Sequence, residues 1–377
     1  MPNINSRKLV NPLAVTAPAS ALKAALSMAT LAADKKVDTP ARIIADRGMI
    51  IFSVANPRSG IAITATTGAT VIAAGEAATS ATRLEALLSG FAPKAEITIG
   101  TAPTCATITS AGSVYRLPLL SDPPAELAID PEIGRVELAT PDCLKLLSVL
   151  PAADTGKTRP YLGGVYLHND GDRLVSVATD ATKLLRTSVP ADPFSTDRTL
   201  IVPALTTTIL HKLLRQVRPE TVTLRRSRTV ISASAPGFEL NSGMIAGPVP
   251  DYERTMPQAK GNAALVQRAE LAAALARLHA VAIGEMPLIV LTWADGEPPQ
   301  LHLARQPQAG QDIMAAQAKG SAQIAFSLPA LTSLVAEFED DAVLLEAEAD
   351  RGVLIRQGDK FAVLMSCRWR FANEAAA

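Results

Sequence analysis

The apolar residues of this chain follow two periods, and the order of the two repeats three times. A period near 3.6 residues marks amphipathic helices, and a period of two marks strands. Helical patterns occur in ASALKAALSMATLAA from Ala19, SATRLEALLSGF from Ser80, TPDCLKLLSVLPAA from Thr140, VPALTTTILHKLL from Val202, RAELAAALARLHAVA from Arg268 and LPALTSLVAEF from Leu328. Alternating, strand-like segments follow every second helix, at AEITIG from Ala95, ETVTLR from Glu220 and DAVLLEAE from Asp341. Each third of the chain therefore reads as helix, strands, helix, strands.

The spacing of two similar helix openings indicates duplication. Pro203 and Pro329 stand at the same point of VPALTTTILHKLL and LPALTSLVAEF, 126 residues apart. One further step of this length leads back from Leu213 to Leu87, inside the helix of the first third. A period this long is typical of tandem domains, since solenoid repeats are much shorter. We predict three tandem α+β domains, over residues 1–134, 135–258 and 259–377, with proline-rich joins at LLSDPPAELAIDPE and GPVPDYERTMPQAKG.

The predicted helix from Leu205 carries basic residues on one half of its surface. At about 100° per residue, Leu205, Ile209 and Leu213 fall on an apolar half, together with Leu210, Leu214 and Val217. The opposite half carries His211, Lys212, Arg215 and Arg218. Such a face is either simply solvated or contacts phosphates, where cations neutralise charge without reading bases. The lack of carboxylates on this half favours phosphate contact.

The composition narrows the class of protein. The chain has 377 residues, 48% of them hydrophobic, and a formal net charge of zero, so any nucleic-acid role depends on where the charges lie. No apolar run reaches the roughly 18 residues of a membrane span, and MPNINSRKLV lacks the apolar core of a secretion signal. Cys105, Cys143 and Cys367 are widely spaced, which suits reduced core thiols better than disulfides or zinc ligands. We expect a cytoplasmic protein.

Sequence motifs for catalysis or metal binding are weak. PAADTGKT, from Pro151, ends like a phosphate-binding loop, but proline occupies the position of its first glycine and an apolar helix precedes it. The four histidines have no metal-ligand spacing, and His279, on an apolar helix, is expected to be a core or interface residue. Asp180 is expected to form a turn. We therefore expect no catalytic residues, no metal and no cofactor.

Four motifs in order resemble the bacterial sliding clamp, the β subunit of DNA polymerase III. They are TRPYLGGVYLHNDGDRLVSVATDATKLLRTSVP from Thr158, LIVPALTTTILHKLL from Leu200, PVPDYERTMP from Pro248 and FAVLMSCRW from Phe361. The middle and last thirds are similar to the family in these motifs, and the first third mainly in its pattern. The resemblance implies a clamp fold, in which two chains join head to tail as a ring of six domains. Helices would line the central hole and antiparallel sheets would lie outside.

The resemblance also implies partners and residue roles. The ring would encircle double-stranded DNA without sequence preference and tether the replicative polymerase, the clamp loader and other proteins with clamp-binding peptides. The DNA-facing residues would be Lys36, His211, Lys212, Arg215 and Arg218. The peptide pocket would be formed by Leu162, Thr179, Lys183, Leu184, Pro250, Arg254, Val363, Leu364 and Met365, unless these residues are plain core. The dimer interface would include Tyr115 and Val281.

The chain departs from the family at the pocket. The family's Gly-His-Arg is Ala181-Thr182-Lys183, and its Met-Pro-Met-Arg-Leu ending is replaced by MSCRW, after which eight more residues follow. Two functions therefore stay open: a non-catalytic processivity factor of a DNA polymerase, or a divergent clamp paralogue that binds partner peptides as a regulator or decoy. An enzyme acting on small molecules is a distant third.

Overall fold

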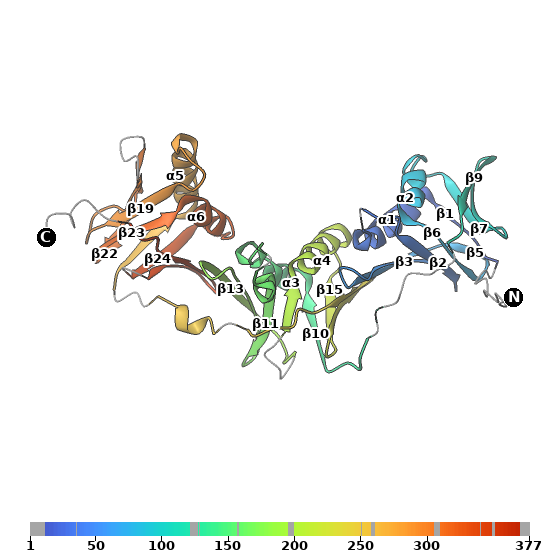
Figure 1. Ribbon diagram of the computed structural model, residues 1–377, viewed down its shortest axis with the longest axis horizontal. Coiled ribbons are helices and arrows are strands. Elements are labelled where there is room, and N and C mark those ends of the chain that lie inside the picture. Colours follow the sequence, from blue (N-terminus) through green and yellow to red (C-terminus); the bar gives the residue numbers. More distant parts are fainter. Residues whose placement is uncertain are drawn as a thin grey trace. The chain divides into compact units, whose positions relative to one another are not determined.

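The computed structural model describes residues 12–34, 36–120, 127, 129–156, 158–194, 200–249, 251–257, 261–304, 310–339, 341–348 and 351–369 (Figure 1). Within these residues the chain forms two compact units, one of residues 1–140 and 208–244 and the other of residues 141–207 and 245–377. Each unit combines helices with antiparallel sheets, so the predicted α+β class is confirmed. The units divide the predicted middle domain, and the three domain boundaries stay a prediction.

The first unit contains two sheets. The five-stranded sheet has the order β5 (Thr70–Ala73), β1 (Ala14–Pro18), β7 (Glu96–Thr101), β8 (Cys105–Ser110) and β9 (Ser113–Pro118). The eight-stranded sheet has the order β10 (Gly134–Ala139), β15 (Thr221–Arg226), β16 (Val230–Ala235), β17 (Phe238–Gly243), β4 (Ile61–Gly68), β3 (Met49–Asn56), β2 (Pro40–Asp46) and β6 (Gly75–Ser80). Strands far apart in sequence meet where β17 pairs with β4.

Two helices of the first unit pack against each other, α1 (Ala19–Ala29) and α2 (Ala81–Ser89), and a short turn η1 (Thr30–Ala32) follows α1 (Figure 1). The helix α2 begins where the Ser80 hydroxyl accepts a hydrogen bond from the Arg83 amide, which satisfies one free amide of the first turn. Leu22, Leu26 and Leu84 are buried on the inner faces of this pair. Their helical spacing is the one that the sequence predicted.

The second unit also contains two sheets. The nine-stranded sheet has the order β14 (Leu200–Pro203), β11 (Gly164–Asp170), β12 (Arg173–Thr179), β13 (Lys183–Pro190), β26 (Lys360–Met365), β25 (Gly352–Gln357), β24 (Ala342–Glu348), β18 (Ala263–Gln267) and β22 (Ala318–Lys319). The four-stranded sheet has the order β21 (Gln311–Ile313), β20 (Gln300–Leu303), β19 (Leu288–Trp293) and β23 (Ala322–Ser327). Again distant strands meet, here where β13 pairs with β26.

The remaining helices are α3 (Thr140–Leu147), α4 (Ala204–Val217), α5 (Arg268–Val281) and α6 (Leu328–Val335), with short turns η2 (Leu150–Ala152), η3 (Pro160–Leu162) and η4 (Glu253–Thr255). The helices α5 and α6 pack together in the second unit (Figure 1). Both duplicated openings begin helices, α4 directly after Pro203 and α6 one residue before Pro329. All six predicted helices are thus present.

The structure corrects two sequence interpretations and narrows a third. Leu205, predicted on the apolar half of its helix, is 52% exposed, because the buried stripe of α4 starts one position later at Thr206. His279, expected to be a core or interface residue, is exposed on α5, which excludes the core and leaves the interface as a prediction. The α6 helix ends at Val335, whereas the helical pattern predicted from Leu328 extends to Phe338.

Candidate functional site: an apolar pocket and an exposed basic helix face

A cavity of about 340 Å³ lies in the second unit, at the end of the β13–β26 pairing. Its walls come from η3, the turn between β12 and β13, residues 248, 251 and 252, and the end of β26. It is lined by Arg159, Tyr161, Leu162, Thr179, Ala181, Thr182, Lys183, Leu184, Pro248, Asp251, Tyr252, Val363 and Met365. We call this cavity the apolar pocket. It joins residues about 200 positions apart in the sequence.

The floor of the apolar pocket is continuous with the core. Leu162, Leu184 and Val363 are buried members of one hydrophobic cluster that also includes Tyr166 and Tyr252. The Tyr166 hydroxyl donates to the Tyr161 carbonyl at 2.6 Å, and burial raises the pKa of Tyr166. The Tyr252 hydroxyl lies 2.9 Å from His168 Nε2. A buried phenol needs such a partner, and these bonds fix the two rings that support the floor.

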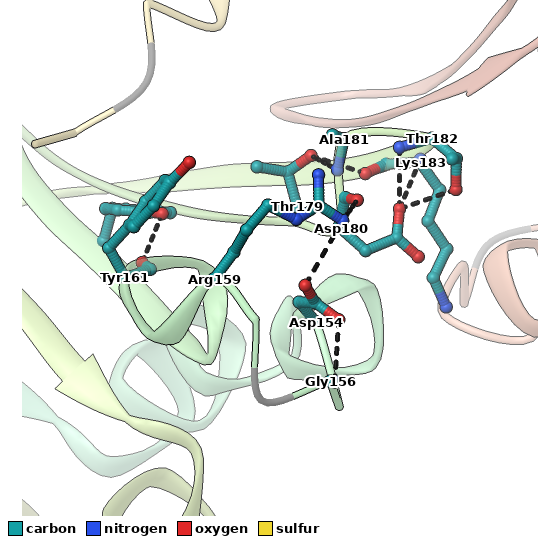
Figure 2. Close-up of polar contacts among 10 residues, drawn as sticks. Asp154, Gly156, Arg159, Tyr161, Thr179, Asp180, Ala181, Thr182 and Lys183 are labelled. Atoms are coloured by element: carbon teal, nitrogen blue, oxygen red, sulfur yellow. Dashed lines mark hydrogen bonds and ion pairs between the residues drawn. The ribbon is translucent and has the colours of Figure 1, made fainter.

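The turn between β12 and β13 forms one edge of the pocket (Figure 2). The Asp180 carboxylate accepts hydrogen bonds from the Thr182 amide and hydroxyl at 2.8 and 2.7 Å and from the Lys183 amide at 2.8 Å. The Thr179 hydroxyl donates to the Lys183 carbonyl at 2.7 Å. Asp180 is therefore a turn former, as the sequence predicted. Ala181 has φ of 74°, a left-handed conformation that is energetically unfavourable for any residue with a β-carbon.

Two cations lie on the rim (Figure 2). Arg159 is 3.3 Å from the Asp154 carboxylate and donates to the Asp180 carbonyl at 3.0 Å. The Lys183 amine donates to the Pro151 carbonyl at 2.7 Å. These contacts attach the 151–159 segment to the β12–β13 turn. An apolar hollow with a few fixed polar groups at its edge is suited to binding a short apolar segment.

Most of the predicted pocket residues meet in this cavity. Leu162, Thr179, Lys183, Leu184, Val363 and Met365 all line it. Leu364 does not, because successive side chains of β26 point to opposite faces of the sheet, and Leu364 is buried on the other one. Arg254 does not line it either; its exposed side chain pairs at 2.8 Å with Asp251, which does. Pro250 lies outside the described residues.

Sequence reasoning missed several lining residues. Arg159 and Tyr161 stand in the same RPYLG stretch as Leu162, and Ala181 and Thr182 adjoin Lys183. Asp251 and Tyr252 belong to the PDY turn, of which only Pro250 was predicted to form the pocket. The signal was therefore present in the motifs, but motif membership does not tell which side chains point into a hollow.

The exposed face of α4 carries the predicted cations. His211, Lys212 and Arg215 are exposed, whereas Ile209 and Leu213 are buried on the other side. Arg218 follows the last helical residue, with φ of 51° and its amide donating to the Leu214 carbonyl at 2.9 Å. Burial and the neighbouring Arg215 cation lower the pKa of His211 from its ordinary value. His211 is therefore largely neutral at pH 7, and the permanent charges of this face are those of the lysine and the arginines.

Lys36 is exposed in the turn that follows η1. Its amide donates to the Asp34 carboxylate at 2.9 Å, and Arg58 lies 3.4 Å from the same carboxylate. The backbone of the turn is thus fixed by Asp34, and the Lys36 side chain is left at the surface. No described contact connects Lys36 with the α4 cations.

The two predicted interface residues both lie at the surface, one on a strand and the other on a helix. Tyr115, on the edge strand β9, is 42% exposed and packs edge to face against Phe91, with 5.6 Å between the ring centroids. Val281, the last residue of α5, is 44% exposed. Unlike a core residue, each side chain therefore keeps a large part of its surface exposed within its own unit.

Among the described residues, no group of three His, Cys, Asp or Glu side chains is placed to hold a metal ion. Cys143 is buried, which raises the pKa of its thiol to about 12 and leaves it unreactive at neutral pH. In the part of the chain that the structure describes, no helix has the length and apolar character of a membrane span.

Antiparallel sheets that join edge to edge, helix pairs and an apolar pocket define the class as a DNA-clamp fold. Comparison with known proteins agrees. Residues 146–251 match the model of the central domain of the DNA polymerase III beta subunit. The beta sliding clamp of Pseudomonas aeruginosa is 26% identical over 204 residues, covering 53% of this chain and 55% of the relative. That of Caulobacter vibrioides is 31% identical over 159 residues, covering 40% and 42%.

The fold extends the likeness along the chain. The crystal structure of a sliding clamp, DNA polymerase III subunit beta, from Bartonella birtlesii bound to griselimycin has a TM-score of 0.85. It is 22% identical, and the alignment covers 95% of this chain and all of that one. By sequence, the chain spans about half the length of the curated relatives it matches. The predicted resemblance is confirmed: this chain has the fold of the bacterial beta sliding clamps, and its middle segment matches their central domain.

Proposed function

We propose that this chain is a DNA sliding clamp, a processivity factor without chemistry of its own. Two copies join head to tail into a ring around duplex DNA, and the apolar pocket holds peptides of the replicative polymerase, the clamp loader and other partners. We expect the ring in the cytoplasm, because it acts on chromosomal DNA. The observation that carries this proposal is the way the sheets join. Both large sheets are built by pairing the edges of distant segments, β17 with β4 and β13 with β26.

Two further edges are suited to the same kind of pairing between copies. The strands β9 and β21 each lie at the edge of a smaller sheet, and no described strand pairs with their outer sides. On β9, Val114 and Tyr115 are 48% and 42% exposed, and on β21, Ile313 is 55% exposed. An uncovered apolar edge strand invites pairing. Pairing of β9 with the β21 of a second copy is head to tail, and two such contacts close a ring.

This proposal assigns one clamp domain to each predicted segment, 1–134, 135–258 and 259–377, and six domains to the ring. We expect a mass of two chains in light scattering. Tyr115→Asp, on one edge, should shift the mass to that of one chain, because a buried unpaired carboxylate opposes the contact. Ile72→Asp alters an apolar residue that is 66% exposed on another strand and should leave the dimer intact. A wild-type protein of one-chain mass at working concentrations would refute the ring.

The cation face of α4, with Lys36, is proposed to face the duplex. Its contacts are electrostatic and weak, so retention depends on closure of the ring and not on tight binding. A clamp loaded on nicked circular DNA should survive a wash in high salt and be lost once the circle is cut. Persistence on linear DNA after the same wash would contradict topological retention.

The charges themselves can be tested by reversal. Lys212→Glu with Arg215→Glu should weaken binding to linear duplex DNA at low salt, and the dependence of that binding on salt, while the dimer persists. Arg47→Glu, in a side chain 91% exposed on another turn, is the control for charge reversal at the surface and should have little effect. Equal binding to linear DNA by the wild type and the double variant would reject the assignment of this face.

The pocket is tested separately from the ring. Leu184→Asp puts a carboxylate into the floor and should abolish binding of a short apolar clamp-binding peptide, measured by fluorescence anisotropy, without changing the dimer mass. The control Ile72→Asp should bind the peptide like the wild type. Full-strength binding by Leu184→Asp would remove the pocket from the proposal.

A further inference from the structure

The chain continues beyond the apolar pocket in a segment that contacts three separate elements. Met365, the last residue of β26, lines the pocket. Its amide donates to the Thr182 carbonyl at 2.9 Å, and the next amide, of Ser366, donates to the Arg351 carbonyl at 3.1 Å. The amide of Cys367 then donates to the Ala325 carbonyl at 2.8 Å. Three successive amides thus donate hydrogen bonds to the β12–β13 turn, to Arg351 just before β25, and to β23. We call residues 366–369 the strap.

The far end of the strap is held by packing. Cys367 and Trp369 are partly buried against Val290, Ala325 and Ala304 of the four-stranded sheet. Val290 and Ala325 are paired residues on β19 and β23, and both are almost fully buried. β23 is an edge strand of that sheet, and the strap bonds to it through the Cys367 amide. Burial also raises the pKa of Cys367, in line with an enclosed position.

We propose that Trp369 is a positioning residue for the apolar pocket. It anchors the strap on the four-stranded sheet, and the strap in turn fixes Met365 and the Thr182 carbonyl at the pocket edge. Trp369 lines no part of the pocket and acts through the backbone between it and Met365. This inference rests on the proposed function, because it presumes that the pocket binds a peptide.

The strap leads away from the apolar pocket. The described chain leaves the pocket at Met365 and reaches the four-stranded sheet by Cys367, so Trp369 is held against Val290 and away from the pocket-lining residues. Trp369 itself is therefore placed outside the pocket. Removing residues 370–377 should leave peptide affinity unchanged, whereas loss of the anchor should weaken it.

The test compares peptide affinity among anchor variants of the full chain. Trp369→Ala should weaken binding of the apolar clamp-binding peptide about tenfold, within the range typical of coupling between neighbouring sites. Trp369→Phe retains an aromatic ring and should restore most of the affinity, which a general loss of stability would not predict. Circular dichroism and dimer mass establish that each variant is folded. Affinity of Trp369→Ala equal to that of the wild type would overturn the inference.

A second measurement requires no change at the anchor. The chain has two tryptophans, and Trp293 is buried on β19. In Trp293→Phe, emission comes from Trp369 alone, and peptide binding should reduce its quenching by acrylamide because coupling between two sites is reciprocal. Unchanged quenching at saturating peptide would overturn the inference. If the wild type binds no peptide while Leu184→Asp behaves like it, the proposed function of the pocket fails instead.

Discussion

Two places in this protein join distant segments in the same way and differ in what the join presents. In the first unit β17 pairs with β4, from Phe238 opposite Ala65 to Ser242 opposite Ile61, and the Gly243 amide donates to the Gly60 carbonyl at 2.8 Å. In the second unit β13 pairs with β26, and the Met365 amide donates to the Thr182 carbonyl at 2.9 Å. We call these the first and second junctions.

The first junction ends at two glycines, whereas the second ends at residues whose side chains line the apolar pocket. Gly60 and Gly243 present only backbone, whereas Ala181, Thr182 and Met365 line the apolar pocket. Antiparallel pairing uses backbone groups alone, so it joins segments whatever their side chains are. Whether the join also binds a ligand depends on the few residues at its end. The predictions below concern residues of the two junctions, the buried Lys360 of β26 and the basic face of α4, from the largest expected effect to the smallest.

Gly352→Ala should cause the largest loss. Gly352 pairs with Met365 in the β25–β26 hairpin and has φ of 152°, and a β-carbon there would collide with the Leu364 carbonyl oxygen. We expect the free energy of unfolding to fall by about 3 kcal/mol or more, as for a main-chain clash with backbone strain, and peptide binding to be lost.

The same hairpin offers a matched control in Gly358→Ala. Gly358 also has positive φ, 55°, but no atom within 4 Å of the added β-carbon. It should cost about 1 kcal/mol, the conformational penalty alone. Chemical denaturation of both variants checks the difference, and equal losses would show that the carbonyl of Leu364 is not the obstacle.

Lys360→Met should destabilise the second unit by about 2 kcal/mol. The Lys360 amine is buried, donates to the Ser148 hydroxyl at 2.8 Å and to the Glu337 carbonyl, and lies over the Phe338 ring. Its loss leaves two acceptors unpaired, at roughly 1 to 3 kcal/mol for such groups. Lys145→Met, at a half-exposed lysine near Asp359, is the control and should change little.

The pH dependence separates this amine from the surface lysines. Burial lowers the pKa of Lys360 from 10.5, so just below that pH the unfolded chain binds more protons than the folded one. Stability contributed at this position therefore rises with pH from the folded pKa up to 10.5. Denaturation between pH 8 and about 10.5 should show this slope in the wild type and its loss in Lys360→Met, whereas an unchanged slope would assign it to another group.

Exchanging the turn residues of the two junctions should have smaller, opposite effects. Ala181 at φ of 74° and Gly60 at φ of 64° have similar backbones in the two turns. Ala181→Gly should stabilise the protein by up to about 1 kcal/mol and Gly60→Ala should destabilise it by about as much. Melting temperatures check the signs. A loss on Ala181→Gly would mean that the methyl group contributes more to the pocket wall than its backbone costs.

His211→Gln should have the smallest effect at neutral pH. Burial and Arg215 lower the pKa of His211 below 6.5, so its imidazole carries little charge at pH 7.5 and DNA retention should be unchanged there. Below pH 6.5 the unfolded chain binds the proton first, so wild-type stability should fall as pH falls through this window. The variant should lack that fall. A clear loss of DNA retention at pH 7.5 would show that the imidazole contributes by another contact.

The fold was accessible from the sequence because its helices and strands have clear periods. The six helices follow apolar stripes, and Leu213 and Leu26 are buried as their spacing predicts. The exposure of Lys212 and Arg215 follows from the same stripe. Where the stripe is ambiguous the prediction was wrong, as for Leu205, which lies at the boundary of the two halves of α4.

The pocket was accessible only in part. Leu162, Leu184 and Met365 were named from motifs, but Leu364 was named with them although its side chain lies on the other face of β26. A motif places a residue in a segment and leaves the direction of its side chain to the register of the strand. Tyr161 and Tyr252 were missed because their roles depend on tertiary contacts. The Tyr161 carbonyl accepts a hydrogen bond from Tyr166, and the Tyr252 hydroxyl lies within hydrogen-bond distance of His168.

The sequence by itself determined the local structure of this protein, because apolar periodicity and turn residues act over a few neighbouring positions. It also predicted a duplication, and the two similar openings at Pro203 and Pro329 do begin helices. Only the tertiary structure decided which strand edges meet and which side chains close the apolar pocket. Those choices depend on register between segments nearly 180 residues apart, such as Leu184 opposite Val363, and backbone pairing of this kind is not encoded in either segment alone.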